Sequence, residues 1–253
     1  MIKMLVWRWI MKVQEKLNMD LEGLWKNGPI TIVAFGDSVT HGALDEGEID
    51  YDTVYWNLLR QKMNKIRNYI PINVINAGIG GLTAQDSIGR MDQQVLAHHP
   101  DLVIVCFGLN DVNGDLQVYL DSLRTIFTKV QESGADLIFM TPNMMNTYVA
   151  DDAPQRWIEY AAVAAEIQNS GKMDLYIGSA VALAKEMGVT VCDCYAKWKE
   201  LSKTQDTTMM LANRINHPTR EMHHLFADSL FETIFGVNKD MVGGNESTMY
   251  QKR

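Results

Sequence analysis

Short apolar runs rich in β-branched residues recur along this 253-residue chain, and longer stretches with helical periodicity separate them. Such alternation is typical of βαβ units, in which a parallel sheet carries helices on both faces. The run at 102–107 is apolar throughout, as expected of a strand that is covered on both sides. We therefore predict an α/β fold with a five-stranded parallel sheet, whose strands span 30–35, 72–76, 102–107, 136–141 and 189–193.

The stretches between these runs predict the helices that cover the sheet. Residues 115–133 carry an apolar stripe at helical spacing, and Asp115 is a suitable capping residue at their start. The stretch 154–187 is interpreted as a long helical region that is broken near 169–171, where Asn, Ser and Gly follow one another. Further helices are predicted at 53–69, at 83–99 with Thr83 as the start, and at 218–235 with Thr219 as the start.

The chain length suits one large α/β domain, which we place at 27–236, followed by a loosely held tail at 237–253. Residues 1–26 are interpreted as an N-terminal amphipathic helical extension. Arg8 and Lys12 interrupt its apolar run and no small-residue cleavage site follows, so a packed helix is favoured over a secretion signal or a membrane-surface anchor. No stretch approaches the roughly 20 apolar residues of a membrane span.

Charge and cysteine content narrow the class of protein. The formal net charge is −8, which disfavours attraction to nucleic acid or anionic lipid. The three cysteines are an odd number, and two of them lie in or beside predicted strands, as is typical of reduced thiols in a cytoplasmic protein. The Cys192-Asp193-Cys194 spacing is a poor metal-binding pattern, so we expect neither a metal site nor a cofactor.

Polar or glycine-rich islands follow the first three predicted strands, and a fourth opens the last helix. Because the carboxyl ends of parallel strands meet at one edge of a sheet, these islands are expected to lie together. A serine hydroxyl needs a base to become a nucleophile, and the oxyanion that forms in acyl transfer needs fixed N–H donors. Ser38 and His217 supply the first pair, and the donors are the backbone of Ser38, the backbone of Gly81 and the side chain of Asn110.

These islands resemble those of the SGNH, or GDSL-type, hydrolase family, in the same order and over residues 30–218. The four residues for which the family is named correspond to Ser38, Gly81, Asn110 and His217. The resemblance implies a three-layer, flavodoxin-like SGNH hydrolase domain. It also implies hydrolysis of esters or thioesters, often of acetyl groups on carbohydrates.

The chain departs from the family at the position three residues before the histidine. Family members commonly carry an aspartate there, whereas this chain has Arg214. An acid normally fixes the imidazole tautomer and stabilises the imidazolium. We therefore expect a Ser38–His217 dyad in which a main-chain carbonyl near Arg214 accepts the imidazole N–H, with Asp193 as the reserve candidate.

Other residues in the islands allow alternative roles. His41 is a second candidate base, but its spacing from Ser38 on a starting helix makes it less suitable. Asp37 and Asp111 are interpreted as backbone anchors. Gly78 and Gly80 compete with Gly81 for the donor position, the alternative being a requirement for positive φ in a turn.

Two segments beside the site each allow two interpretations. An acidic run within 45–52 is interpreted as a solvated loop that repels anionic substrates, rather than a calcium loop; it comprises Asp45, Glu46, Glu48, Asp50 and Asp52. A segment after the fourth strand either lines an acyl or leaving-group pocket or packs as an ordinary loop; its side chains are Met144, Met145, Tyr148 and, further on, Trp157.

The sequence therefore predicts a cytoplasmic serine esterase that acts through an acyl-enzyme on a small ester, with an acetyl ester of a carbohydrate or a similar polar molecule as the first choice. A lipase-like enzyme or a thioesterase for longer acyl chains is the alternative of the same class. A catalytically silent binding protein is the alternative of another class, motivated by Arg214. The expected partner is the small-molecule ester, and the N-terminal helix is a candidate for a homo-oligomer contact.

Overall fold

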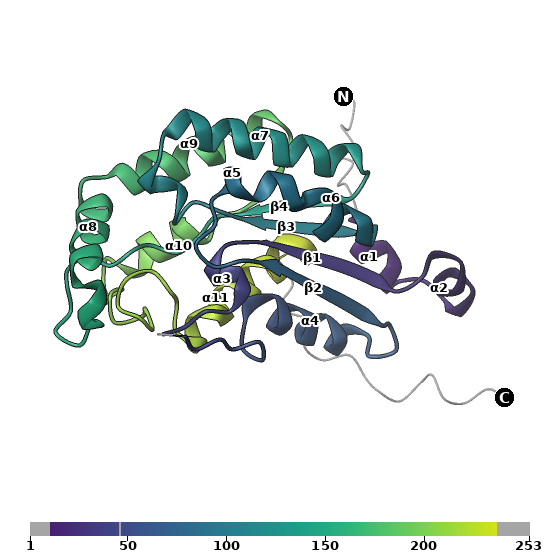
Figure 1. Cartoon of the computed structure of the whole chain (residues 1–253). Helices are drawn as coiled ribbons and strands as arrows, with labels where there is room; N and C mark the ends of the chain where they lie inside the picture. Colours follow the sequence, from purple (N-terminus) through teal and green to yellow (C-terminus); the bar gives the residue numbers. More distant parts are fainter. Residues whose placement is uncertain (1–10, 46, 237–253) are drawn as a thin grey trace, which may run out of the picture.

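The computed structural model describes residues 11–45 and 47–236 of the chain. Within them a five-stranded, all-parallel sheet has the strand order β2-β1-β3-β4-β5 (Figure 1). The predicted fold class and all five predicted strands are thereby confirmed. The strands are β1 (Ile30–Gly36), β2 (Ile72–Gly78), β3 (Leu102–Cys106), β4 (Asp136–Met140) and β5 (Thr190–Cys192).

Helices connect the strands, and those predicted at 53–69, 115–133 and 218–235 are confirmed with slightly shorter bounds. The α-helices are α1 (Lys12–Leu17), α2 (Leu21–Asn27), α3 (Ser38–His41), α4 (Tyr55–Ile66), α5 (Ala84–Ser87), α6 (Met91–Gln94), α7 (Leu116–Glu132), α8 (Ile158–Asn169), α9 (Lys172–Glu186), α10 (Cys194–Leu201) and α11 (Arg220–Phe235). Short 3₁₀ helices are η1 (Ile88–Arg90), η2 (Leu96–His98), η3 (Asp111–Asn113) and η4 (Gln155–Trp157).

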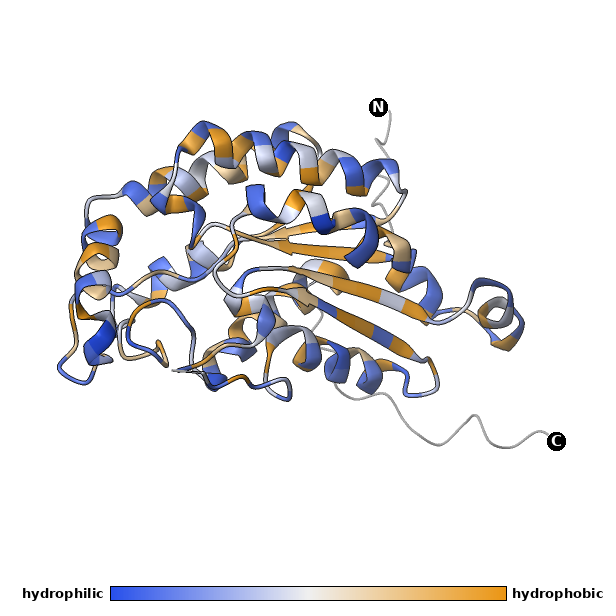
Figure 2. Ribbon diagram, viewed as in Figure 1, coloured by the Kyte–Doolittle hydropathy of each residue, from blue (hydrophilic) through white to orange (hydrophobic). Residues whose placement is uncertain are grey.

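The sheet is the middle layer of three. Helices α5, α7 and α9 lie over one face, and α4 and α11 pack together over the other (Figure 1). All five residues of β3 are buried, because helices cover both of its sides. Figure 2 shows β3 and β4 as almost continuously hydrophobic, whereas the edge strand β2 alternates, and the core accordingly sits along the middle of the sheet.

The predicted helix at 83–99 is wrong as a single element. It begins as expected, since the Thr83 hydroxyl accepts from the backbone N–H of Asp86. It then breaks into α5, η1, α6 and η2, because Val95 leaves the helical region and His99 adopts a positive φ of 47°. Helix α10 was not predicted at all; it begins at Cys194, directly after the capping residue Asp193, whose carboxylate accepts from the N–H of Ala196.

Helix α1 of the N-terminal segment packs on the domain, whereas α2 has no buried residue. Val13 and Leu17 of α1 are part of the buried core, and the Lys16 ammonium pairs with Asp101 at 2.8 Å. The first ten residues of the extension predicted at 1–26, and the tail predicted at 237–253, lie outside the described residues. In the described part of the chain, every helix is too short or too polar to cross a bilayer.

Candidate active site

The strand order brings the first three islands side by side. β1 lies between β2 and β3, and Gly36, the last residue of β1, stands level with Gly78 on one side and Cys106 on the other. The chain segments that leave these three strands therefore start at one edge of the sheet. The order reverses between β1 and β3, the place where open α/β sheets bind ligands.

Ser38 begins the short helix α3, which is pressed against the ends of β1 and β2. Asp37 caps this helix, with Oδ1 accepting from the N–H of Val39 at 3.0 Å. A Cβ at Gly78 would lie 2.3 Å from the backbone nitrogen of His41, so only a glycine allows this close approach. The packing leaves the Ser38 side chain nearly buried, at 7% exposure.

His217 is hydrogen-bonded to Ser38 and to a main-chain carbonyl. Nε2 of His217 lies 2.9 Å from Oγ of Ser38, and Nδ1 lies 2.9 Å from the carbonyl oxygen of Leu44. Because a carbonyl can only accept, Nδ1 must carry the proton. Nε2 then has its lone pair toward Ser38 and accepts from the serine hydroxyl. This is the arrangement in which an imidazole can remove the hydroxyl proton.

The backbone of His217 is held by a side chain that sequence reasoning missed. Oδ1 of Asn213 accepts from the backbone N–H groups of Ile215, Asn216 and His217, each at 3.0 Å. An asparagine at the start of a turn is a weak sequence signal for such a role, because asparagine side chains commonly hydrogen-bond to nearby backbone. Asn213 therefore fixes the turn from which the histidine projects.

Burial lowers the pKa of His217, while the hydrogen bond to Leu44 and the charge of Asp45 raise it in part. The net direction is downward from the usual histidine value. The imidazole is therefore neutral at pH 7, which is the state that can accept a proton.

The three predicted oxyanion donors line one cavity with Ser38 and His217. Its volume is about 400 Å³. Gly81 adopts a φ of 81°, and in the described residues neither its N–H nor that of Ser38 has a hydrogen-bond acceptor. The Asn110 amide donates one N–H to the carbonyl of Leu82 at 2.9 Å, which fixes the amide and leaves its second N–H for a ligand.

The wall of this cavity opposite the strand ends comes from η4 and the start of α8. Trp157 is part of this wall, so the interpretation of this residue as a pocket-lining side chain is confirmed. Met144 and Met145 instead are buried in the core, so ordinary packing is the correct interpretation for them. Tyr148 is also outside this cavity and donates its hydroxyl to Asp206. The wall consists of Pro154, Arg156, Trp157 and Tyr160.

A main-chain carbonyl accepts from the imidazole as predicted, but the prediction that this carbonyl lies near Arg214 was wrong. The acceptor is Leu44, which is distant in sequence and carries no side-chain signal for this role. Arg214 has a φ of 57°, and its guanidinium pairs with Asp152 at 2.9 Å and donates to the carbonyl of Leu211. It is thereby held away from the imidazole of His217.

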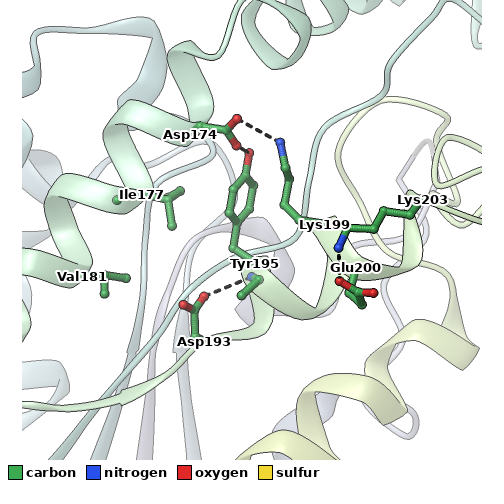
Figure 3. A pocket seen from close by; sticks show the side chains of 10 residues that line it. Asp174, Ile177, Val181, Asp193, Tyr195, Lys199, Glu200 and Lys203 are labelled. Carbon is green, nitrogen blue, oxygen red and sulfur yellow. Dashed lines mark hydrogen bonds and ion pairs between the residues drawn. The ribbon is translucent and has the colours of Figure 1, made fainter.

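The reserve candidate, Asp193, was also wrong. Its Oδ1 accepts from the N–H of Ala196 and from the hydroxyl of Thr141. Asp193 is therefore the capping residue of α10 and not a partner of His217. It lines a second cavity of about 340 Å³ between α9 and α10 (Figure 3). The polar groups there pair with one another, with Asp174 accepting from both Tyr195 and Lys199.

Asp37 and Asp111 are anchors, as predicted. Oδ1 of Asp111 accepts from the N–H of Ala84 at 2.8 Å and so holds the segment that follows Gly81. Burial raises the pKa of Asp37 to about 7, with a contribution from the charge of Asp111, and burial raises the pKa of Asp111 to about 6.

His41, the second candidate base, lines the cavity, but its Nε2 faces the hydroxyl of Tyr51 and not Ser38.

The described residues contain no cluster of three or more acidic, histidine or cysteine side chains that could hold a metal ion. Three side chains of the acidic run at 45–52 do not converge on a common point. Asp50 and Glu48 pair with Arg220, and Asp45 lines the cavity. Glu46 lies outside the described residues.

Comparison with known proteins bears on the fold and the family of this chain. The chain is 26% identical over 220 residues to an acetylxylan esterase of Geobacillus stearothermophilus, covering 80% of this chain and 93% of that protein. The solved structure of that esterase, Axe2, covers 81% of this chain and 94% of its own, with a TM-score of 0.64 and 23% identity. An α/β hydrolase from the metagenome of Lake Arreo, Spain, is similar in fold, with a TM-score of 0.65, 19% identity, and coverage of 83% and 96%.

The remaining comparison concerns the family itself. Residues 34–225, most of the described domain, match the GDSL-like Lipase/Acylhydrolase family. The matched range includes every residue of the cavity that the islands were expected to supply. The resemblance noted in the sequence is thereby confirmed, and the chain belongs to the GDSL-like lipase/acylhydrolase family, whose members are serine esterases.

Proposed function

We propose that this esterase removes small acyl groups, in the first place acetyl, from the hydroxyl groups of a carbohydrate. Ser38 is the nucleophile and His217 the general base. The observation that carries the proposal is the continuous chain of hydrogen bonds from Ser38 through His217 to the Leu44 carbonyl, at the wall of a cavity that also holds the oxyanion donors.

The residues allow a balanced acyl transfer. Oγ of Ser38 attacks the ester carbonyl while its proton passes to Nε2 of His217. The tetrahedral oxyanion accepts from the N–H groups of Ser38 and Gly81 and from the free N–H of Asn110. The C–O bond to the alcohol then breaks, and His217 gives its proton to the departing alcohol. Water, activated by the same imidazole, hydrolyses the acyl-enzyme and releases the carboxylic acid.

A dyad accounts for this site better than a triad. Catalytic mutants of Axe2 replace a serine, a histidine and an aspartate, and that aspartate lies three positions before the histidine. The same position here is Arg214, which pairs with Asp152. The Leu44 carbonyl takes over the fixing of the tautomer, but it carries no full negative charge to stabilise the imidazolium. The neighbouring Asp45, whose charge raises the pKa of His217, supplies part of that stabilisation.

Two features favour an acetylated sugar as the substrate. The cavity of about 400 Å³ has room for a small acyl group together with one ring of an alcohol. Trp157, half exposed on its wall, offers an apolar face of the kind on which a sugar ring can lie. The similarity to an acetylxylan esterase agrees with this choice. The cavity wall carries one carboxylate, Asp45, and one guanidinium, Arg156, so its charge does not oppose a neutral sugar ester.

A panel of p-nitrophenyl esters and acetylated sugars tests the proposal. We expect kcat/KM to fall steeply beyond acetate and propionate, and acetylated xylose oligomers to be better substrates than simple acetates. A maximum at longer acyl chains would instead identify the lipase-like or thioesterase alternative. Ser38→Ala should abolish turnover of every ester in the panel, and turnover at the wild-type rate would refute the assignment of the nucleophile.

A further inference from the structure

We propose that Arg220 is a positioning residue of the esterase reaction: it ties the loop that carries Leu44 to the helix that follows His217. The inference rests on the proposed function, in which His217 is the base. It goes beyond that function because it names the device that keeps a main-chain carbonyl in the place of the missing acid.

The Leu44 carbonyl needs such a device because it lies in a loop, not in a strand or a helix. The loop is closed by its own backbone bonds. The N–H of Leu44 donates to the carbonyl of Glu48 at 3.0 Å, and the N–H of Asp50 donates to the carbonyl of Gly42 at 2.8 Å. These bonds join the two arms of the loop to each other. The N–H of Ala43 also donates to the carbonyl of Ser38 at 2.9 Å, which attaches the first arm to α3. Among the described residues, no backbone bond joins the second arm, with Glu48 and Asp50, to the segment that carries His217.

Arg220 provides that connection. It is the first residue of α11, three positions after His217. Its Nε donates to Oδ2 of Asp50 at 2.7 Å, and its terminal nitrogen pairs with Glu48. One guanidinium therefore holds both carboxylates on the returning arm of the loop. The planar fork of arginine fixes two partners at once, which a lysine ammonium does not do with the same geometry.

The position of Arg220 is not explained by the formation of its helix. A cation in the first turn of a helix is opposed by the helix dipole, which favours acidic residues there. Glu221, the next residue, is of the favoured kind. The side chain at 220 therefore has its reason in the loop, where Asp50 is only 15% exposed and is also held by the N–H and hydroxyl of Thr53.

The first experiment separates positioning from ordinary surface pairing. Arg220→Ala should lower kcat for p-nitrophenyl acetate by about 10- to 100-fold, because a small displacement of a catalytic group costs that much, with KM within about twofold of wild type. The matched control is Arg124→Ala. Arg124, on α7, is as exposed as Arg220, 50% against 49%, and pairs with Glu186 at the end of α9. The control should leave kcat unchanged.

The second experiment observes the imidazole itself. In ¹⁵N-histidine protein, the ring of His217, assigned by comparison with His217→Gln, should show a single Nδ1–H tautomer. In Arg220→Ala it should show a mixture of tautomers, since the Leu44 carbonyl no longer fixes one. Arg220→Lys should recover part of kcat and part of the tautomer preference. Glu48→Gln, which removes only one of the two ion pairs, should give a smaller loss in the same direction.

The outcomes are distinct. Unchanged kcat and tautomer in Arg220→Ala would overturn the proposal and leave Arg220 as an exposed ion pair. A lower kcat with an unchanged tautomer would also overturn it, since the effect would then come from elsewhere in the fold. If Arg220→Ala does not fold, Glu48→Gln decides by the same two readings. Failure of the proposed function would be seen separately, as turnover that survives Ser38→Ala.

Discussion

The buried carboxyl of Asp37 should make the stability of this protein fall as pH rises, and a single substitution should remove this dependence. Asp37 caps the helix of Ser38 through Oδ1, while Oδ2 is buried and has no partner among the described residues. Burial raises its pKa from 3.8 to about 7. The folded protein therefore keeps the proton at pH values where the unfolded chain has lost it, so stability falls as pH rises from about 4 to about 7.

The size of the effect follows from the two pKa values. A difference from 3.8 to about 7, at about 1.4 kcal/mol for each pH unit, amounts to ~4 kcal/mol of lost stability at pH 8 relative to pH 4. Asp37→Asn keeps an oxygen for the cap and does not titrate. A buried amide N–H without a partner costs roughly 1–3 kcal/mol, and that cost is the same at every pH.

Urea unfolding of both proteins at pH 4.5, 6, 7 and 8 measures this effect. The free energy of unfolding of Asp37→Asn minus that of wild type should rise by ~3–4 kcal/mol across the series, whatever its value at pH 4.5. Asp20→Asn is the control, because Asp20 caps α2 by the same kind of bond on the exposed surface. A difference that stays flat or falls with pH would refute the account of Asp37.

Three other substitutions or conditions test the geometry of the site. Gly78→Ala should destabilise the fold by about 1–3 kcal/mol in thermal unfolding, whereas Gly89→Ala, with open space at its Cβ, should be tolerated. The acid limb of kcat/KM should have its midpoint below about 6.5, because burial lowers the pKa of His217 and protonation of the base abolishes activity; a midpoint above 7 would contradict this. Arg214→Asp should not raise kcat, since the Leu44 carbonyl already occupies Nδ1; a tenfold gain would show that an acid can still reach the imidazole.

Much of the fold was predictable because each strand is a short apolar run bounded by polar or glycine residues. The helix at 83–99 was less so. Its side chains keep a helical period, but 3₁₀ turns preserve a similar period over short lengths, and the positive φ of His99 is not visible in the pattern. Cytoplasmic location and a homo-oligomer contact stay predictions.

The site also has a part that could be predicted from the sequence and a part that could not. Ser38 and His217 could be predicted to meet, because their chemistry is carried by side chains placed at strand and helix ends. The Leu44 carbonyl could not, since every residue has a carbonyl and only the folded loop shows which one approaches Nδ1. Asn213 left a weak signal, as an asparagine at the start of a turn. Main-chain contacts and local turns were thus the part that required the structure.

Covalent labelling tests the central claim most directly. The wild-type protein, treated with a fluorophosphonate probe and digested for mass spectrometry, should carry one adduct, on Ser38. Ser38→Ala should carry none, and His217→Ala should label more slowly by about 10²-fold or more, because the base that activates the hydroxyl is gone. An adduct on another residue, or equal labelling of Ser38→Ala, would contradict the assignment of Ser38 as the nucleophile.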